Sequence, residues 1–171
     1  DQSSLKDTYL ALGPCAMGNS SLKAKEDGRR LVIRGAGEDE VNGLFVEASK
    51  TENGSAQFFY DGRTRNHAPI VLWFTPHGNQ WSIRKDARGC ASTSKLWYIA
   101  SAATGADITA ELPPVTGWAV SAKAAHRASG KAQYSIDPPP SIEVLSQGAD
   151  VPADVLSSME AKGQKYQDDK E

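Results

Sequence analysis

The sequence contains few of the residues on which catalysis and metal binding usually depend. Its 171 residues include two cysteines and three histidines. There is no C-x-x-C pair and no H-x₃₋₅-H spacing, and the nucleophile motif G-x-S-x-G is also absent. We therefore expect no enzyme activity, no metal and no cofactor. The histidines, His67, His77 and His126, are predicted to lie on the surface.

The chain also lacks an excess of one charge and a long hydrophobic run. The formal net charge is -2 and the pI is about 6.0, whereas a nucleic-acid-binding face is basic. The basic run from Lys23 to Arg34 is interrupted by Glu26 and Asp27, which predicts a solvated face. The longest apolar run, Ile70 to Phe74, is far shorter than the roughly 18 residues of a membrane span. We expect no nucleic-acid partner and no transmembrane segment, and any membrane association would be peripheral, through partner proteins.

The two cysteines leave the cellular compartment open. In an oxidising compartment Cys15 and Cys90 would form a disulfide, which would stabilise the fold by about 2–4 kcal/mol. In a reducing compartment they would remain free thiols. Asn19 and Asn53 begin N-x-[ST] sequons that would accept a glycan in a secreted chain.

Aromatic residues are concentrated in the middle of the chain. Of the thirteen Trp, Tyr and Phe residues, ten lie between Phe45 and Trp118. Because such side chains dominate protein cores, we expect the core there. Short β-branched or aromatic runs separated by glycine and proline turns predict strands at 31–33, 44–46, 57–60, 70–74, 81–83, 96–99, 108–112 and 117–120. This pattern predicts an all-β fold, a small antiparallel barrel or sandwich of seven or eight short strands.

Polar segments flank this core on both sides. We expect an N-terminal arm at residues 1–28, the β-rich core domain at 29–120 and a C-terminal arm at 121–171. Extended polar arms are ordered only when something holds them, and the surface of a partner is the simplest candidate.

The C-terminal arm is expected to contain short elements of its own. They are a weak edge strand, a Pro-rich connector and an extended piece, at residues 132–136, 138–140 and 142–145. Asp150 is predicted to cap a short helix that begins at Val151 and carries Val155 and Met159 on the same face. The tail beyond Gly163 is predicted to be disordered on its own.

Two local motifs suggest ligands but are better explained as turns. Gly35-Ala36-Gly37 follows a strand, as a dinucleotide-binding loop does, but Glu40 stands where that loop needs its third glycine. The carboxylates of residues 38–40 would repel a pyrophosphate. Adjacent carboxylates also point in different directions, unlike the spaced ligands of a Ca²⁺ site. We expect a glycine turn followed by a solvated acidic turn.

Three aromatic residues are candidates for contact with a ligand or a partner. Trp97, Tyr98 and Trp118 would form a stacking platform if their rings were exposed, and part of the core if buried. Pro113-Pro114 should end the preceding strand, because proline donates no ladder hydrogen bond. Gly117 then lets the chain turn and brings Trp118 back towards one end of the barrel. Trp118 is expected to be the most exposed of the three.

The order of these signatures resembles a known module. Val41-Asn42-Gly43, Trp81-x-Ile83 and Pro113-Pro114-x-x-Gly117-Trp118 follow the pattern V-N-G … W-x-I … P-P-x-x-G-W of a small β module that recurs in algal and other protist proteins. The resemblance covers about residues 30–120. It implies a β-rich interaction or scaffold module, with no catalytic residues to carry over.

Together these features predict a non-catalytic accessory or linker subunit whose partners are protein subunits of a larger assembly. The algal resemblance and the polar arms would suit a plastid photosynthetic complex at the thylakoid. The alternative is a carbohydrate- or small-ligand-binding β module of a secreted protein. That alternative requires Trp97, Tyr98 and Trp118 to form a solvent-facing row.

Overall fold

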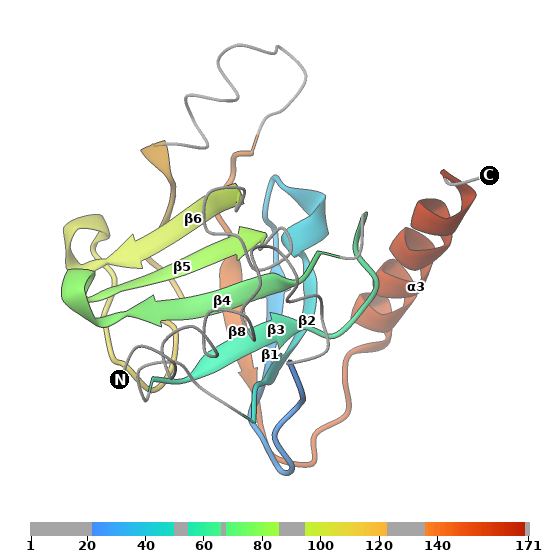
Figure 1. Ribbon diagram of the computed structural model, residues 1–171, viewed down its shortest axis with the longest axis horizontal. Helices are drawn as coiled ribbons and strands as arrows, with labels where there is room; N and C mark the ends of the chain where they lie inside the picture. Colours follow the sequence, from blue (N-terminus) through green and yellow to red (C-terminus); the bar gives the residue numbers. More distant parts are fainter. Residues whose placement is uncertain (1–21, 50–54, 66–67, 86–94, 123–135, 170–171) are drawn as a thin grey trace, which may run out of the picture.

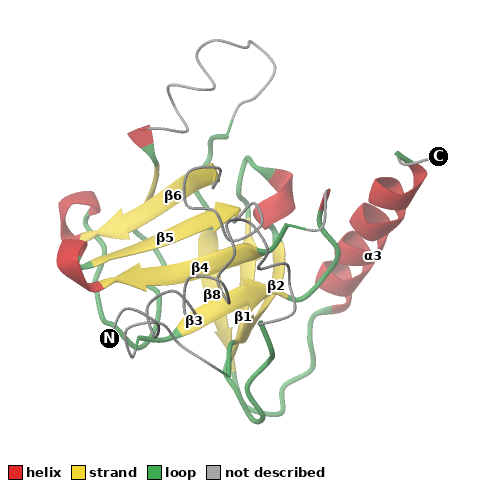
Figure 2. Ribbon diagram, in the orientation of Figure 1, coloured by secondary structure: helices red, strands yellow, loops and turns green. Residues whose placement is uncertain are grey.

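One antiparallel sheet forms most of the structure. The computed structural model describes residues 22–49, 55–65, 68–85, 95–122 and 136–169. In this part of the chain eight strands make a single sheet that curls into a half-barrel, with one α-helix outside it (Figures 1 and 2). The predicted all-β class with short antiparallel strands is confirmed. The sheet curls on itself and does not divide into a sandwich.

The strands follow one another across the sheet in chain order, with one exception. They are β1 (Arg30–Arg34), β2 (Gly43–Glu47), β3 (Gln57–Tyr60), β4 (Ile70–Thr75), β5 (Gln80–Lys85), β6 (Lys95–Ser101), β7 (Trp118–Val120) and β8 (Ser141–Leu145), with 3₁₀ turns η2 (Asp39–Val41), η4 (Pro76–Gly78) and η5 (Ala102–Thr104). The spatial order is β7-β6-β5-β4-β3-β2-β1-β8. The last strand therefore returns to the first, and Ile142 of β8 pairs with Ile33 of β1.

Residues 108–112, predicted as a strand, form a loop instead. The Thr109 hydroxyl donates to the Leu112 carbonyl at 3.1 Å and accepts the Leu112 N–H at 3.4 Å, which folds the segment on itself. The Thr109 carbonyl accepts the indole N–H of Trp81 at 2.7 Å. Ile108 and Leu112 pack against the core from this loop. The strand prediction is wrong because the polar groups of Thr109 are used locally and by Trp81, not by a neighbouring strand.

The inner face of the curl holds the core. Alternate residues of each strand point inward, as period-two alternation requires. The largest fully buried side chains are Trp81, Tyr98, Phe45 and Phe58. Their rings meet at angles rather than face to face, with Phe58 and Phe74 each tilted against Trp81 at centroid distances of 6.3 and 5.4 Å. The sequence correctly placed the core in the middle of the chain.

Helix α3 (Ala153–Asp168) covers the outer face of the sheet at β1 and β2. Val155 and Met159 pack on Val32 of β1 and Leu44 of β2, which confirms the predicted apolar helix face. Figure 1 shows the helix beside these strands. Both β8 and α3 thus come from the segment expected to be a C-terminal arm. No helix in the described part of the chain has the length and apolar character needed to cross a membrane.

The two ends of α3 differ from the sequence prediction. The N-cap residue is Pro152, whose carbonyl accepts the Val155 N–H, so Asp150 does not cap the helix. The helix also continues past Gly163 to Asp168, and the prediction of a disordered tail is wrong for these residues. Tyr166 is held there by the Arg65 guanidinium, 5.7 Å from its ring centroid.

Replacing Trp118 by alanine should destabilise the fold. Gly117 adopts a φ of +83°, as the expected turn requires, and Trp118 is 6 % exposed with its indole N–H donating to the Pro114 carbonyl at 2.9 Å. Trp118→Ala should therefore lower the free energy of unfolding by about 3–5 kcal/mol, as measured by chemical denaturation. An unchanged stability accompanied by lost binding of a partner would instead assign Trp118 to a contact surface.

Candidate functional site

The three aromatic residues proposed as contacts all lie in the core. Trp97 and Trp118 are each 6 % exposed and Tyr98 is fully buried. The expectation that Trp118 is partly exposed is wrong, because its ring packs in the core cluster and its indole N–H donates to the Pro114 carbonyl. Trp73, on the outer face of β4, is more exposed than these and lies under the Arg84 guanidinium, 3.9 Å from the ring centroid. No stacking platform is formed by Trp97, Tyr98 and Trp118.

Tyr98 has a structural role that the sequence did not suggest. Its hydroxyl accepts the backbone N–H of Glu38 at 2.9 Å and donates to the Ile136 carbonyl at 2.6 Å. Glu38 follows β1 and Ile136 precedes β8, whereas Tyr98 belongs to β6 near the other edge of the sheet. A hydroxyl that both donates and accepts thus joins segments from the two sides of the curl.

Several predicted features fall outside the described residues. These are Cys15, Cys90, His67, His126, the sequon asparagines Asn19 and Asn53, and residues 132–135 of the edge strand predicted at 132–136. The last residue of that prediction, Ile136, is described and is not in a strand. His77 lies in η4 and is exposed, as predicted. Among the described residues, no group of three or more His, Cys, Asp and Glu side chains is placed to hold a metal ion.

The acidic turn is not simply solvated, contrary to the prediction. Glu40 forms an ion pair with the buried Lys85 of β5, and burial raises the pKa of Glu38. The amine of Lys162, from α3, donates to the backbone carbonyls of Asp39 and Asn42. Two basic side chains distant in sequence therefore converge on this loop. Their effect is to fix the loop to the sheet and to the helix.

The basic run also makes internal contacts. Arg29 binds Glu47 through two parallel bonds, Nε to Oε2 at 3.0 Å and an Nη to Oε1 at 2.8 Å, and its backbone N–H donates to Oε2 at 2.9 Å. Lys25 lies 3.4 Å from the same carboxylate. These contacts lower the pKa of Glu47 to about 2. The expectation of a solvated basic face is wrong for Arg29.

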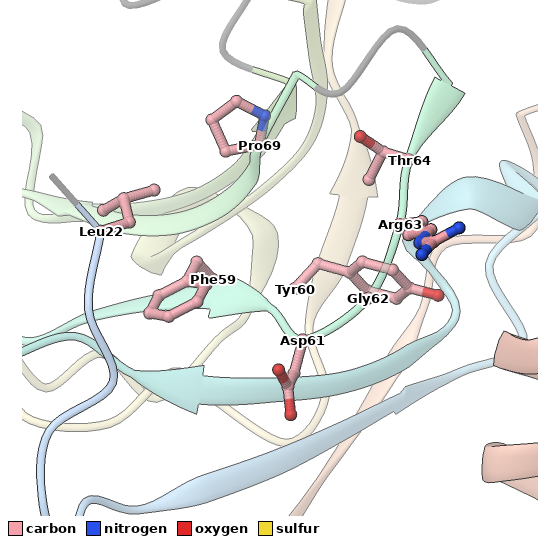
Figure 3. A pocket seen from close by; sticks show the side chains of 8 residues that line it. All are labelled: Leu22, Phe59, Tyr60, Asp61, Gly62, Arg63, Thr64 and Pro69. Atoms are coloured by element: carbon pink, nitrogen blue, oxygen red, sulfur yellow. The ribbon is translucent and has the colours of Figure 1, made fainter. Parts of the chain in front are cut away.

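A small cavity of about 250 Å³ lies at the end of β3. It is lined by Leu22, Phe59, Tyr60, Asp61, Gly62, Arg63, Thr64 and Pro69. In Figure 3 the Asp61 and Arg63 side chains point in different directions, so they form no paired acid and base. The Thr64 hydroxyl donates to the Ala68 carbonyl and is occupied there. Burial raises the pKa of Tyr60 to about 12, which keeps its phenol protonated near neutral pH.

A larger groove of about 950 Å³ lies at the opposite end of the sheet. It runs between the segment 24–30, which leads into β1, and the segment 145–151, which joins β8 to α3. Figure 1 shows both segments, blue and orange, together below the sheet. Its described apolar lining residues are Val46, Leu145, Val151 and Leu156, with Ala24 and Ala149.

The groove is lined by both apolar and charged side chains. Leu156 is 44 % exposed, one of few large hydrophobic side chains so exposed in the described chain. The charged lining residues are Lys25, Asp27, Arg29, Arg30, Glu47 and Asp150. Arg30 donates to the Ala149 carbonyl, which ties the two walls together. Apolar and charged side chains also occur together in protein–protein interfaces.

No aromatic side chain occurs among the lining residues that the structure describes. A groove for sugars or flat ligands would use such rings, so its chemistry favours a protein partner. Sequence analysis missed this site, because its walls come from three segments that no local pattern connects. The one feature of the sequence that could have indicated the groove was Leu156, a large hydrophobic residue on the predicted helix, which the structure places at the surface.

Comparisons with known proteins give no relative for this chain. No family model matches it, no curated protein matches it, and no solved structure matches it.

The pairing of Arg29 with Glu47 predicts a specific dependence of stability on pH. A carboxyl group whose pKa falls from 4.5 to about 2 on folding stabilises the protein fully above about pH 5. That contribution is lost as the pH falls towards 2. Glu47→Gln should cost about 2–3 kcal/mol at pH 7 and almost nothing at pH 2. Urea denaturation across this range measures it, and equal losses at both pH values would contradict the assignment.

Proposed function

We propose that the chain is a non-catalytic accessory or linker subunit that binds a partner protein of a larger assembly. The observation that carries the proposal is the groove, with its half-exposed Leu156 and its charged lining residues. A protein side chain buried on Leu156 and Val46 would gain apolar contact, and the charged lining residues would set the orientation of the partner.

The charged groups near the groove support binding rather than catalysis. Glu47 is 5 % exposed and its carboxylate is saturated by Arg29 and Lys25. The low pKa of Glu47 removes it as a general base near neutral pH. Membership of a plastid photosynthetic complex is the narrower form of this proposal, and it rests on the resemblance to the algal module.

The carbohydrate-binding alternative has less support. It requires an exposed row of rings at Trp97, Tyr98 and Trp118, and all three are buried.

A charged side chain at Leu156 in the groove should release the partner. Leu156→Glu puts a carboxylate where an apolar contact is expected, and the exposed site leaves the fold intact because surface changes are usually within about 0.5 kcal/mol. The matched control is Ser157→Glu, the next residue of α3, which is exposed and is not among the groove-lining residues.

The measurement is the elution of tagged full-length chain from extracts of its native cells. The unsubstituted chain and Ser157→Glu should elute in a complex, and Leu156→Glu as the free chain. If Leu156→Glu stays in the complex, the groove is not the interface. If the unsubstituted chain elutes alone, the chain is not an accessory subunit.

A further inference from the structure

Met159 is the side chain that links the middle of α3 to the sheet. It packs against the inner core cluster and against the outer cluster of Val32 and Leu44. Its sulfur Sδ accepts the backbone N–H of Leu44 at 3.3 Å. Since a thioether is a weak acceptor, this contact depends on close and specific placement of the sulfur.

Two glycines make room for this side chain. A Cβ atom on Gly43 would lie 3.1 Å from Met159 Cγ and 3.3 Å from Sδ, and one on Gly62 would lie 3.1 Å from Cε. The same Cβ on Gly43 would lie 2.6 Å from the Tyr60 ring. The Met159 side chain is therefore packed closely against the two glycines, with little space for an added oxygen on the side that faces the sheet.

Met159 is only partly buried, which gives a small oxidant access to it. The neighbouring attachments of α3 are different in kind. Val155 is buried, Lys162 donates to the carbonyl of Asp39 at 2.9 Å, and Asp154 pairs with Arg34 near the start of the helix. The central attachment is thus the one that oxidation would alter directly.

We infer that Met159 is an oxidation-sensitive contact that holds α3 on β1 and β2. A peroxide is the oxidant: the sulfur lone pair takes one oxygen, the O–O bond breaks, an S–O bond forms, and hydrogen peroxide leaves as water. The sulfoxide is more polar and larger than the thioether, and reductases convert it back to methionine. The added oxygen would displace the sulfur from its place 3.3 Å from the Leu44 nitrogen and would put a polar group against the apolar side chains of Val32 and Leu44, which disfavours the docked helix.

Release of α3 would dismantle the groove. Leu156 belongs to the helix and Val151 immediately precedes it, so two of the apolar lining residues would move with α3. Partner binding would then fall when Met159 is oxidised. This consequence rests on the proposed function, whereas the release of α3 does not.

Hydrogen peroxide treatment of the full-length chain tests the inference. The chain has two methionines, Met17 and Met159, so Met17→Leu and Met159→Leu isolate each sulfur. Leucine keeps the apolar volume of methionine and is usually tolerated. Mass spectrometry of peptides quantifies the sulfoxide at each position, and hydrogen–deuterium exchange reports the protection of residues 153–168.

In the unsubstituted chain and in Met17→Leu, oxidation should speed exchange in residues 153–168 about tenfold, equivalent to about 1.4 kcal/mol. In Met159→Leu the same treatment should leave exchange unchanged. Complete oxidation of Met159 with unchanged exchange would overturn the inference. So would equal acceleration in Met159→Leu, or a Met159 that stays reduced while free methionine is converted.

The elution experiment separates this inference from the proposed function. An oxidised chain with released α3 that remains in its complex supports the Met159 contact and contradicts the groove as interface. A chain that leaves its complex through Leu156→Glu, but keeps α3 docked after oxidation, contradicts the Met159 contact alone.

Discussion

The fold depends on keeping an eight-stranded sheet curled, and the Tyr98 hydroxyl is the contact that does this most directly. The inner face of the sheet carries most of the buried apolar side chains, and it is buried only if the sheet closes around it. Tyr98 stands in β6 and bonds to the segments that follow β1 and precede β8. A second bond, from the Ile142 N–H to the Val115 carbonyl at 3.1 Å, joins β8 to the loop before β7.

One charged pair lies near each end of β2. At one end Glu47 is bound by Arg29, and at the other Glu40 is paired with Lys85. Glu47 is the last residue of β2, and its partner Arg29 directly precedes β1. Glu40 lies in the 3₁₀ turn η2, and its partner Lys85 is the last residue of β5. The charged side chains of these pairs already bind one another, which explains why the groove offers few free groups for chemistry. The groove surface carries the exposed Leu156 beside charged lining residues.

Much of the fold was predictable because it follows local rules. Residues 57–60 form a strand with the predicted bounds, and Val155 and Met159 share a helix face at the expected spacing. The failures have specific causes. Residues 108–112 have strand-like composition, but their backbone groups bond elsewhere. The Leu112 carbonyl accepts the Thr109 hydroxyl, and the Thr109 carbonyl accepts the indole N–H of Trp81. The pairing of β8 with β1 joins residues over a hundred positions apart, such as Ile33 and Ile142, and no local pattern encodes it.

The candidate site was the least predictable part. Whether an aromatic side chain packs in the core or contacts a ligand depends on its burial, which the sequence does not show. Trp97 and Trp118 are of a residue type that often forms binding platforms, but both are buried in the core. The groove is assembled from segments around residues 24–30, 46–47 and 145–156. Only the return of β8 and α3 to the first two strands brings these segments together. The candidate site therefore follows from topology more than from any motif.

The account is tested most directly by replacing Tyr98 with phenylalanine, which keeps the ring and removes the hydroxyl. The N–H of Glu38 and the carbonyl of Ile136 then lose their common partner, which should cost about 1–3 kcal/mol. Tyr166→Phe, on α3 outside the curl, is the matched control. Chemical denaturation with hydrogen exchange on β8 measures the effect. The account predicts a clear loss of stability and faster exchange in β8 for Tyr98→Phe alone. Unchanged stability and unchanged β8 exchange would show that the sheet stays curled without this contact.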